Sequence, residues 1–248
     1  MSKPGASVPV HRVRFVDWSP SAITALALSP VAWTESAAAG RSVLAIGRDN
    51  GNIDLCTWCE GQSGSIAQGW SPVWTLLGEE NYKIESLAFT ASASHLRLFS
   101  TSGGSIVSEH FLPSSLTGQQ AADTRTPTRT LSSHGGAIWS MAASPTGKFL
   151  AIGCEDGVVR LIDVAGDAFE HVGTGMHVAP RMTRVASRIL SLAWGPPRRE
   201  MATSNDSDDD DDEAWRDTYL LGGLGNSTAA VWDVPTGQLK SRLTVLKN

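Results

Sequence analysis

The sequence has few cysteines and no long apolar run, and each shortage excludes a class of protein. Three cysteines in 248 residues are an odd number, which does not suit a disulfide framework and favours a reducing compartment. The apolar stretches are too short for a helix that spans a bilayer. The N-terminal segment MSKPGASVPV also lacks the apolar core of a secretory signal. These shortages predict an intracellular chain without membrane contact.

Outside a single acidic run, the sequence has no large excess of charge of either sign. The run covers residues 206–213 and holds seven of the 25 acidic residues, so the rest of the chain has 25 − 7 = 18 acids against 20 bases. Packed like charges repel one another, and we therefore expect a disordered acidic insertion over 204–214. Two roles remain open for it: binding basic proteins, or only keeping the chain soluble.

What the sequence does contain is a repeated unit. With 41% hydrophobic residues, the chain can bury a large core as one all-β domain or two smaller domains. Each unit has a short apolar strand, a second strand that ends in Gly or Ser, a tight turn and a third strand, as in AIGCEDGVVRLIDV at 151–164. This order of alternating apolar positions and Gly-containing turns is typical of antiparallel hairpins. The units begin at Ile23, Ile84, Ile138 and Ile189.

The spacing of the units predicts a propeller. Their starts lie 61, 54 and 51 residues apart, more than the roughly 40 to 45 residues of a minimal blade, and a fourth, outer strand fits at each junction. Four-stranded sheets repeated in this way are the blades of a β-propeller. We therefore predict an all-β fold of about four four-stranded antiparallel blades, an incomplete part of a larger propeller. The predicted units of this partial propeller, 1–248, lie near 23–78, 84–133, 138–173 and 189–246.

Two further segments predict that the propeller is open. A strand at 10–18 precedes the first unit, and the last strand, at 238–246, ends the fourth. A blade gains stability from neighbours on both sides, so an open array exposes a face at each end. We expect an open arc of blades; a small ring closed by these two strands is the alternative.

The repeats resemble the WD-repeat family. The one intact signature dipeptide is Trp232-Asp233, which the turn TGQL follows. Cys56-Thr57 and Glu109-His110 stand where the dipeptide would be in the first two units, and Ile162 stands where the third unit would have its tryptophan. The resemblance implies that the hydrogen-bonded structural network of the family is only partly present in this chain. The residues assigned to that network are His134, Ser140, Asp156, Asp163, Trp232 and Asp233.

Other segments resemble the cirhin family of nucleolar, U3 small nucleolar RNA-associated WD-repeat proteins. They include VHRVRF at 10–15 and SSHGGAIWS at 132–140, and the similarity extends from His11 to Val245. The resemblance implies the amino-terminal propeller of a larger subunit of the small-subunit processome. It further implies a nuclear and nucleolar scaffold for pre-18S rRNA processing, with other processome proteins as partners. Contact with pre-rRNA stays open.

Two sets of reactive side chains have both a chemical and a structural interpretation. Cys56 and Cys59 have CxxC spacing, but a structural zinc site needs four ligands and no second pair follows. Strand packing is favoured, with Cys56 in a buried position. His134, Ser140 and Asp156 make up a Ser/His/Asp set, yet the same residues form the structural network, and structural use is favoured. We predict no catalytic residue, metal, cofactor or small-molecule substrate.

Arginines gather between residues 181 and 199 and could meet phosphate. A solvated surface, or a counter-charge for the acidic run, is the favoured alternative. Arg181, Arg184 and Arg188 are therefore only candidate interface residues. Besides the scaffold, two other functions remain: a generic WD-repeat adaptor such as a ubiquitin-ligase substrate receptor, and a propeller hydrolase or redox enzyme.

Overall fold

The computed structural model describes most of the repeated units. Three sequence predictions lie outside the described residues: the acidic run 206–213, the strand at 10–18, and Arg181. Within the described part of the chain, no helix is long and apolar enough to cross a membrane. The described residues are 21–30, 42–59, 69–78, 82–91, 96–112, 129–173, 182–199 and 215–244.

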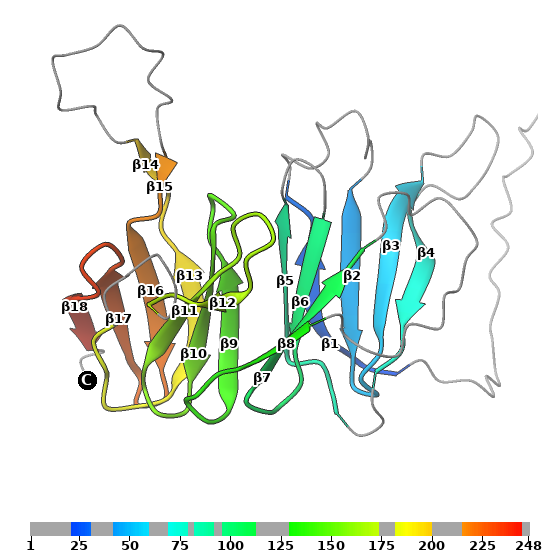
Figure 1. Cartoon of the computed structure of the whole chain (residues 1–248). Helices are drawn as coiled ribbons and strands as arrows, with labels where there is room; N and C mark the ends of the chain where they lie inside the picture. The colour runs from blue at the N-terminus through cyan, green and yellow to red at the C-terminus, as the bar shows by residue number, and fades with distance from the viewer. Residues whose placement is uncertain are drawn as a thin grey trace, which may run out of the picture.

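Four four-stranded antiparallel sheets, which we name blades 1 to 4, make up the fold (Figure 1). Blade 1 contains β1 (Ile23–Leu28), β2 (Val43–Arg48), β3 (Ile53–Cys59) and β4 (Gly69–Leu76). Blade 2 contains β5 (Ser86–Ala91), β6 (Leu96–Thr101), β7 (Ile106–Phe111) and β8 (Arg129–Ser132). Blade 3 contains β9 (Ile138–Ala143), β10 (Phe149–Cys154), β11 (Val159–Asp163) and β12 (Glu170–His171). Blade 4 contains β13 (Ile189–Trp194), β16 (Tyr219–Leu224), β17 (Thr228–Asp233) and β18 (Leu239–Thr244). The all-β prediction with four-stranded antiparallel blades is confirmed.

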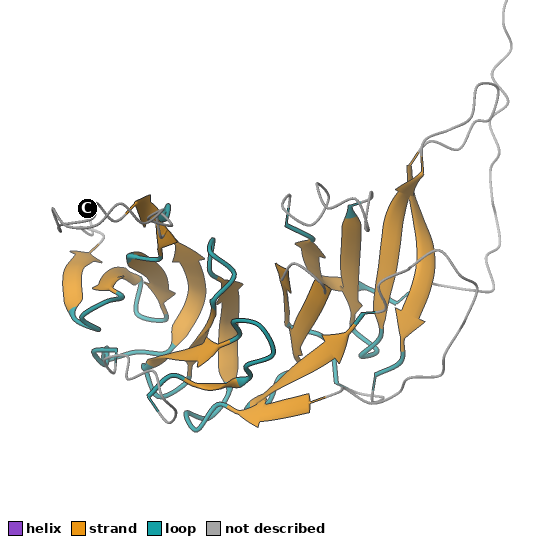
Figure 2. Ribbon diagram, turned by 45° about the horizontal axis from the view of Figure 1, so that its top comes forward, coloured by secondary structure: helices purple, strands orange, loops and turns teal. Residues whose placement is uncertain are grey.

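The blades stand side by side through their first strands. β1 contacts β5, β5 contacts β9, and β9 contacts β13, so the four sheets fan out from these strands (Figure 2). A short ribbon of β14 (Arg198–Arg199) and β15 (Trp215–Arg216) extends from blade 4. In Figure 1 this ribbon lies at the top of the molecule.

The opposite end of the blades is formed by turns and links. The links between blades are hydrogen-bonded to the turns between second and third strands: Ile84 N donates to Arg48 O at 3.0 Å, and Val185 N donates to Gly157 O at 2.9 Å. This arrangement places links and turns at one end, which we call the turn face. It consists of residues 49–52, 82–85, 102–105, 133–137, 155–158, 182–188 and 225–227.

Apolar side chains fill the space between neighbouring blades. Leu55 and Leu98 belong to the cluster between blades 1 and 2, Phe99 lies between blades 2 and 3, and Trp232 lies between blades 3 and 4; all four are fully buried. Full burial of one such side chain stabilises the fold by about 1.5–3 kcal/mol. The blade-to-blade contacts are therefore the core of the molecule.

Blade 2 differs from the other blades in the register of its first strand pair. In blades 1, 3 and 4 the first strand has a register shift that leaves one residue, Thr24, Trp139 or Leu190, without a partner on the second strand. β5 pairs with β6 without a shift. The shift comes before the regular part of the strand pair, where the pair of Ser86 and Thr101 in blade 2 corresponds to that of Ser140 and Gly153 in blade 3, so it does not change which way the later residues face.

The side chains of β6 and β7 face the same way as those of the other blades. Ile162 of blade 3 and Trp232 of blade 4 each point toward the preceding blade. His110 takes the equivalent place in blade 2, because it pairs with Leu98 as Ile162 pairs with Leu150. The sequence prediction, which places Glu109 there, is therefore off by one residue: Glu109 pairs with Phe99 and points toward the following blade.

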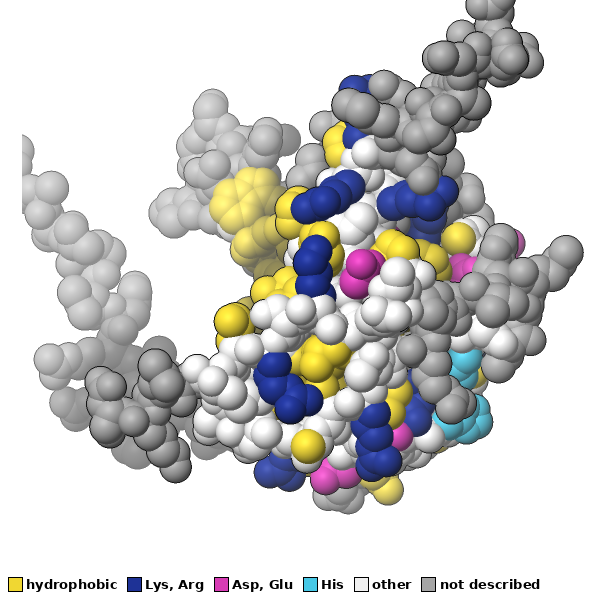
Figure 3. Space-filling model, turned by 90° about the vertical axis from the view of Figure 1, so that its left-hand side faces the viewer, with side chains coloured by type: hydrophobic (Ala, Val, Ile, Leu, Met, Phe, Trp, Pro, Cys, Tyr) yellow, Lys and Arg dark blue, Asp and Glu magenta, His cyan; other side chains and the backbone are white. Residues whose placement is uncertain are grey.

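The outer faces of the first and last blades carry exposed apolar residues. Leu26 and Leu28 of β1 are 60% and 58% exposed, and Leu243 of β18 is 57% exposed. Figure 3, which views the blade 4 side, shows apolar side chains interspersed with Lys and Arg. Exposed apolar patches of this kind are typical of interaction surfaces.

Candidate interaction surface

The residues predicted as one structural network have separate partners. Ser140 Oγ donates to Ile189 O at 3.1 Å and so joins blade 3 to blade 4. Asp156 accepts two hydrogen bonds from Arg160, at 3.0 and 2.7 Å. Although burial raises the pKa of Asp156, the hydrogen bonds from Arg160 and from Val158 N lower it overall. The carboxylate is therefore charged and already paired.

His134 is exposed and does not reach Ser140 or Asp156 by a hydrogen bond within the described residues. Its ring lies 5.1 Å from that of His171, and its carbonyl accepts from Arg160 Nη2 at 3.0 Å. Burial lowers the pKa of His171, and nearby His134 lowers it further, against a hydrogen bond with Ser132 O that raises it. Arg160 is thus the residue that connects His134 with Asp156.

Trp232 and the two predicted aspartates stabilise local structure. Trp232 Nε1 donates to Thr183 O at 2.8 Å, which attaches β17 to the link on the turn face. A Cβ at Gly222 would lie 2.8 Å from the indole of Trp232, so only glycine fits there. Asp163 Oδ1 accepts from Ala165 N at 2.9 Å, and Asp233 N donates to Gln238 O across the TGQL turn at 2.9 Å.

The cysteines do not form a described metal or redox centre. Cys56 is buried, and burial together with the charge of Asp54 raises its pKa, so the thiol stays protonated. The side chain of Cys59 lies outside the described part of the structure. Among the described residues, no group of three or more His, Cys, Asp or Glu could hold a metal ion.

The predicted arginine cluster is split between the two ends of blade 4. Arg184 and Arg188 lie on the link of the turn face, ahead of β13, whereas Arg198 and Arg199 form β14 beyond its far end. The structure therefore brings Arg184 and Arg188 to one surface and separates them from the other two.

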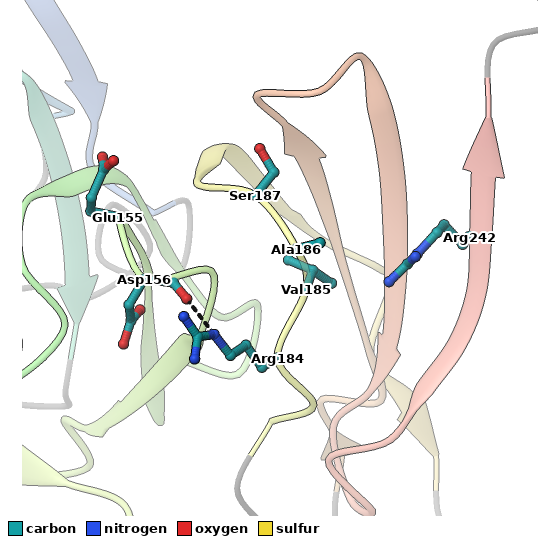
Figure 4. A pocket seen from close by; sticks show the side chains of 7 residues that line it. All are labelled: Glu155, Asp156, Arg184, Val185, Ala186, Ser187 and Arg242. Carbon is teal, nitrogen blue, oxygen red and sulfur yellow. Dashed lines mark hydrogen bonds between the residues drawn. The ribbon is translucent and has the colours of Figure 1, made fainter.

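A cleft on the turn face, between blades 3 and 4, contains Arg184. We name it the arginine cleft; its volume is about 440 Å³, and Figure 4 shows its side chains. Arg242 of β18, which the sequence analysis did not single out, reaches into it from the opposite side. The cleft is lined by Glu155, Asp156, Arg184, Val185, Ala186, Ser187 and Arg242.

The acidic side chains of the arginine cleft already have hydrogen-bond partners, whereas its two arginines have N–H groups without a partner among the described residues. Glu155 accepts a hydrogen bond from Trp139 Nε1, and Asp156 is paired with Arg160. Arg184 uses Nε to donate to Asp156 O at 2.8 Å, and Arg242 makes no hydrogen bond or ion pair with a described residue. Both guanidinium groups can therefore bind an added carboxylate or phosphate.

Next to this cleft, Arg188 lies over the ring of Trp139 at 4.8 Å from the ring centre. Trp139 is the unpaired residue of the β9 register shift and is 39% exposed. A guanidinium stacked on a tryptophan is a favourable cation–π contact. The stacked pair extends the cationic surface from the cleft toward the first strands of the blades.

Sequence reasoning missed a buried ion cluster between blades 2 and 3. Arg97 and Glu109 are 1% and 0% exposed, and Arg97 Nε donates to Glu109 Oε1 at 2.5 Å. Arg129 pairs with the other carboxylate oxygen at 2.5 Å. The signal in the sequence was an Arg in LRLFS and a Glu at the predicted signature position, but their pairing depends on the register of blade 2.

Arg97 also attaches blade 2 to the chain that follows β11. Its Nη1 donates to Val164 O at 2.7 Å and to Gly166 O at 2.8 Å, and its Nη2 donates to Ala168 O at 2.7 Å. Arg129 Nη1 adds a bond to Asp167 O at 2.9 Å. Because the buried charges are paired and hydrogen-bonded, the cluster fixes how blades 2 and 3 meet.

Comparison with known proteins identifies the repeats and a group of relatives. The WD40 family model, described as WD domain, G-beta repeat, matches residues 125–163, which include β8 to β11. U3 small nucleolar RNA-associated protein 4 of Schizosaccharomyces pombe is 31% identical over 95% of this chain and 28% of its own length. Its homolog in Homo sapiens is 30% identical over 79% of this chain and 23% of its own length.

Among solved structures, a chain in the crystal structure of the mitotic checkpoint complex matches 81% of this chain and 49% of its own, with 18% identity and a TM-score of 0.48. The chain spans about a quarter of the length of the curated relatives it matches. Its similarity to them covers most of the described blades. The chain is therefore similar over most of its length to U3 small nucleolar RNA-associated protein 4, in line with the resemblance to the cirhin family, and one of its repeats matches the WD40 family model.

Proposed function

We propose that the chain is a non-enzymatic scaffold segment of the small-subunit processome, which acts in pre-18S rRNA processing through protein contacts. The similarity to U3 small nucleolar RNA-associated protein 4 over as much as 95% of the chain carries this proposal. The hydrogen-bond partners of Ser140 and Asp156, and the absence of a hydrogen bond from either to His134 among the described residues, support a structural use of these groups. A role in the processome also implies a nucleolar location.

The arginine cleft is the surface that we assign to this scaffold function. The guanidinium N–H groups of Arg184 and Arg242 that have no partner among the described residues can bind an acidic group on a processome partner. Arg184 lies on a link positioned by rigid sheets, where binding residues are commonly found, and Arg242 lies on strand β18. Arg188, stacked on Trp139, would border the same contact.

The proposal is tested in cells with the native full-length protein carrying a tag. We expect nucleolar signal and co-purification of pre-18S rRNA precursors, and a several-fold lower recovery of processome proteins with the double variant Arg184→Gln, Arg242→Gln. Lys148→Gln, on the β9–β10 turn, is the matched control. A cytosolic protein that recovers no precursor would reject the proposal and favour the generic WD-repeat adaptor.

We also propose that the apolar outer faces of blades 1 and 4 pack against further β-sheets of a larger propeller. Leu26, Leu28 and Leu243 supply the apolar area, and the relatives are several times longer than this chain. Residues 1–248 alone should then self-associate or have a low melting temperature. A compact monomer with a cooperative thermal transition, measured by size-exclusion chromatography and calorimetry, would contradict the open arc.

A further inference from the structure

A second cleft opens on the turn face, between blades 1 and 2. Its volume is about 470 Å³, and we name it the neutral cleft. Blade 1 contributes an apolar wall that includes Ile53, Leu76 and Leu77. Tyr82 and Ile106 also line it and are 55% and 50% exposed, so a large apolar surface is accessible at its edge.

The blade 2 wall of the neutral cleft is a row of hydrogen-bonding groups without charge. Ser100, Ser108, His110 and Thr130 lie on adjacent strands of one sheet face. Ser100 Oγ and His110 Nε2 are 2.9 Å apart and share a hydrogen bond. The other ring nitrogen of His110 has no hydrogen-bond partner among the described residues. An uncharged donor or acceptor would therefore find several partners here.

Among the described residues, no charged group lines the neutral cleft. Burial lowers the pKa of His110 to about 4, with a smaller opposite effect of Glu109, so the ring is neutral at pH 7. Charged residues next to the lining in the sequence form ion pairs: Asp54 with Arg48 at 2.8 Å, and Lys83 with Glu85 at 3.2 Å. A charged ligand would lose its hydration here without gaining a counter-ion.

We propose that the neutral cleft is a docking site for an uncharged side chain of a partner protein, with an apolar body and a hydrogen-bonding tip, as in tyrosine or glutamine. The apolar wall of blade 1 would hold the body, and the hydroxyl and imidazole groups of blade 2 would bind the tip. Apolar and aromatic anchors seated in pockets dominate protein interfaces.

A nucleic acid suits the neutral cleft less well than a protein segment. A nucleotide brings a phosphate, and phosphate binding needs Lys or Arg side chains. The lining supplies neither residue type, in contrast to the arginine cleft on the same face. The proposal rests on this geometry alone and holds whether or not the chain acts in the processome.

The site is tested by NMR on the chain with isotope-labelled histidine rings, in which His110→Gln assigns the His110 signal. The probes are N-acetyl-tyrosinamide and N-acetyl-glutaminamide, compared with the charged N-acetyl-glutamic acid amide and N-acetyl-lysinamide, and with adenosine. We expect the two uncharged amides to shift the His110 signal with a Kd about tenfold or more below those of the other probes, since burying an unpaired charge is costly.

Three variants locate the binding. Ser108→Phe should fill the cleft and abolish the shift, and Thr130→Val should weaken binding about threefold by removing one hydroxyl. Ser187→Phe, the same kind of substitution in the arginine cleft, should leave binding unchanged. Tighter binding of adenosine or of a charged amide overturns the proposal. So does a His110 signal that no probe moves, or binding that neither Ser108→Phe nor Thr130→Val changes.

Discussion

The two faces of blade 2 make opposite kinds of contact with their neighbours. Toward blade 1 the face is apolar near the first strands, with Leu98 buried, and uncharged near the outer strands, where Ser108 and His110 line a cleft. Toward blade 3 it carries the ion pair of Arg97 and Glu109, with exposures of 1% and 0%. One sheet thus has one neutral, open interface and one ionic, closed interface.

The comparison teaches that the residues at equivalent positions, and not a different strand register, give the two interfaces their character. Phe99 pairs with Glu109 as Ala151 pairs with Leu161, and both pairs face the following blade. Leu98 pairs with His110 as Leu150 pairs with Ile162, and both pairs face the preceding blade. Blade 2 has charged residues on the first of these faces, and hydroxyl and imidazole groups on the second.

The largest expected effect comes from removing the carboxylate of the ionic interface. Glu109→Ala leaves the buried Arg97 without its counter-charge, and we expect a loss of about 3–5 kcal/mol in the free energy of unfolding. The double variant Arg97→Met, Glu109→Leu buries no charge and should recover most of this loss, although three carbonyl oxygens lose their donor. Urea denaturation measures both. Equal stability of the single variant and the original protein would show that the ionic interface is unimportant.

The neutral interface should respond to pH. The pKa of His110 is lowered from 6.5 to about 4, so the unfolded chain binds a proton in this range that the folded chain does not. Stability is then highest above pH 6.5 and falls as the pH decreases toward 4, by about 3 kcal/mol in total. His110→Gln should remove this part of the dependence, while His171, whose pKa is also lowered, adds the same smaller slope to both proteins. Parallel curves in urea denaturation across this range would contradict the prediction.

The smallest expected effect is that of replacing Arg129, one of the two arginines that pair with Glu109. Arg129 is 37% exposed, against 1% for Arg97, so solvent screens its ion pair. Arg129→Gln should lower the free energy of unfolding by about 1 kcal/mol or less. Thermal denaturation of this variant beside Arg97→Gln provides the measurement. A larger loss at Arg129 than at Arg97 would reverse our ranking of the two contacts.

Strands and units were predictable from the sequence because period-two apolar patterns and Gly-containing turns are local signals. The first strands at Ile23, Ile84, Ile138 and Ile189 were expected, and β1, β9 and β13 begin at three of these positions. The fourth, β5, begins at Ser86, two residues later, and it is the strand without the register shift. The first strand whose predicted start differs most from the structure is thus the one that lacks the register shift of the other blades.

The sites were less predictable, because they depend on pairings between distant residues. Arg184 was a candidate from its local cluster, but Arg242 follows it by 58 residues and joins it only when β18 lies beside the link. Arg97 reaches carbonyl groups about 70 residues later. His110 is part of a cleft because it pairs with Leu98 in the register of β6 and β7, which no nearby motif specifies.

The face-specific side chains of blade 2 also limit how the repeats can be exchanged. A chimera that replaced blade 2 with a copy of blade 3 would keep the facing of the sheet, but Phe149 would stand in the place of Arg97 and Leu161 in the place of Glu109. The carbonyl groups of Val164, Gly166 and Ala168 would lose the guanidinium that binds them, and the wall opposite Ile53 would lose its hydroxyl groups. A chimera should therefore transfer blades 1 to 3 together. A single repeat, as the sequence defines it, cannot be exchanged by itself because its side chains are matched to both neighbouring blades.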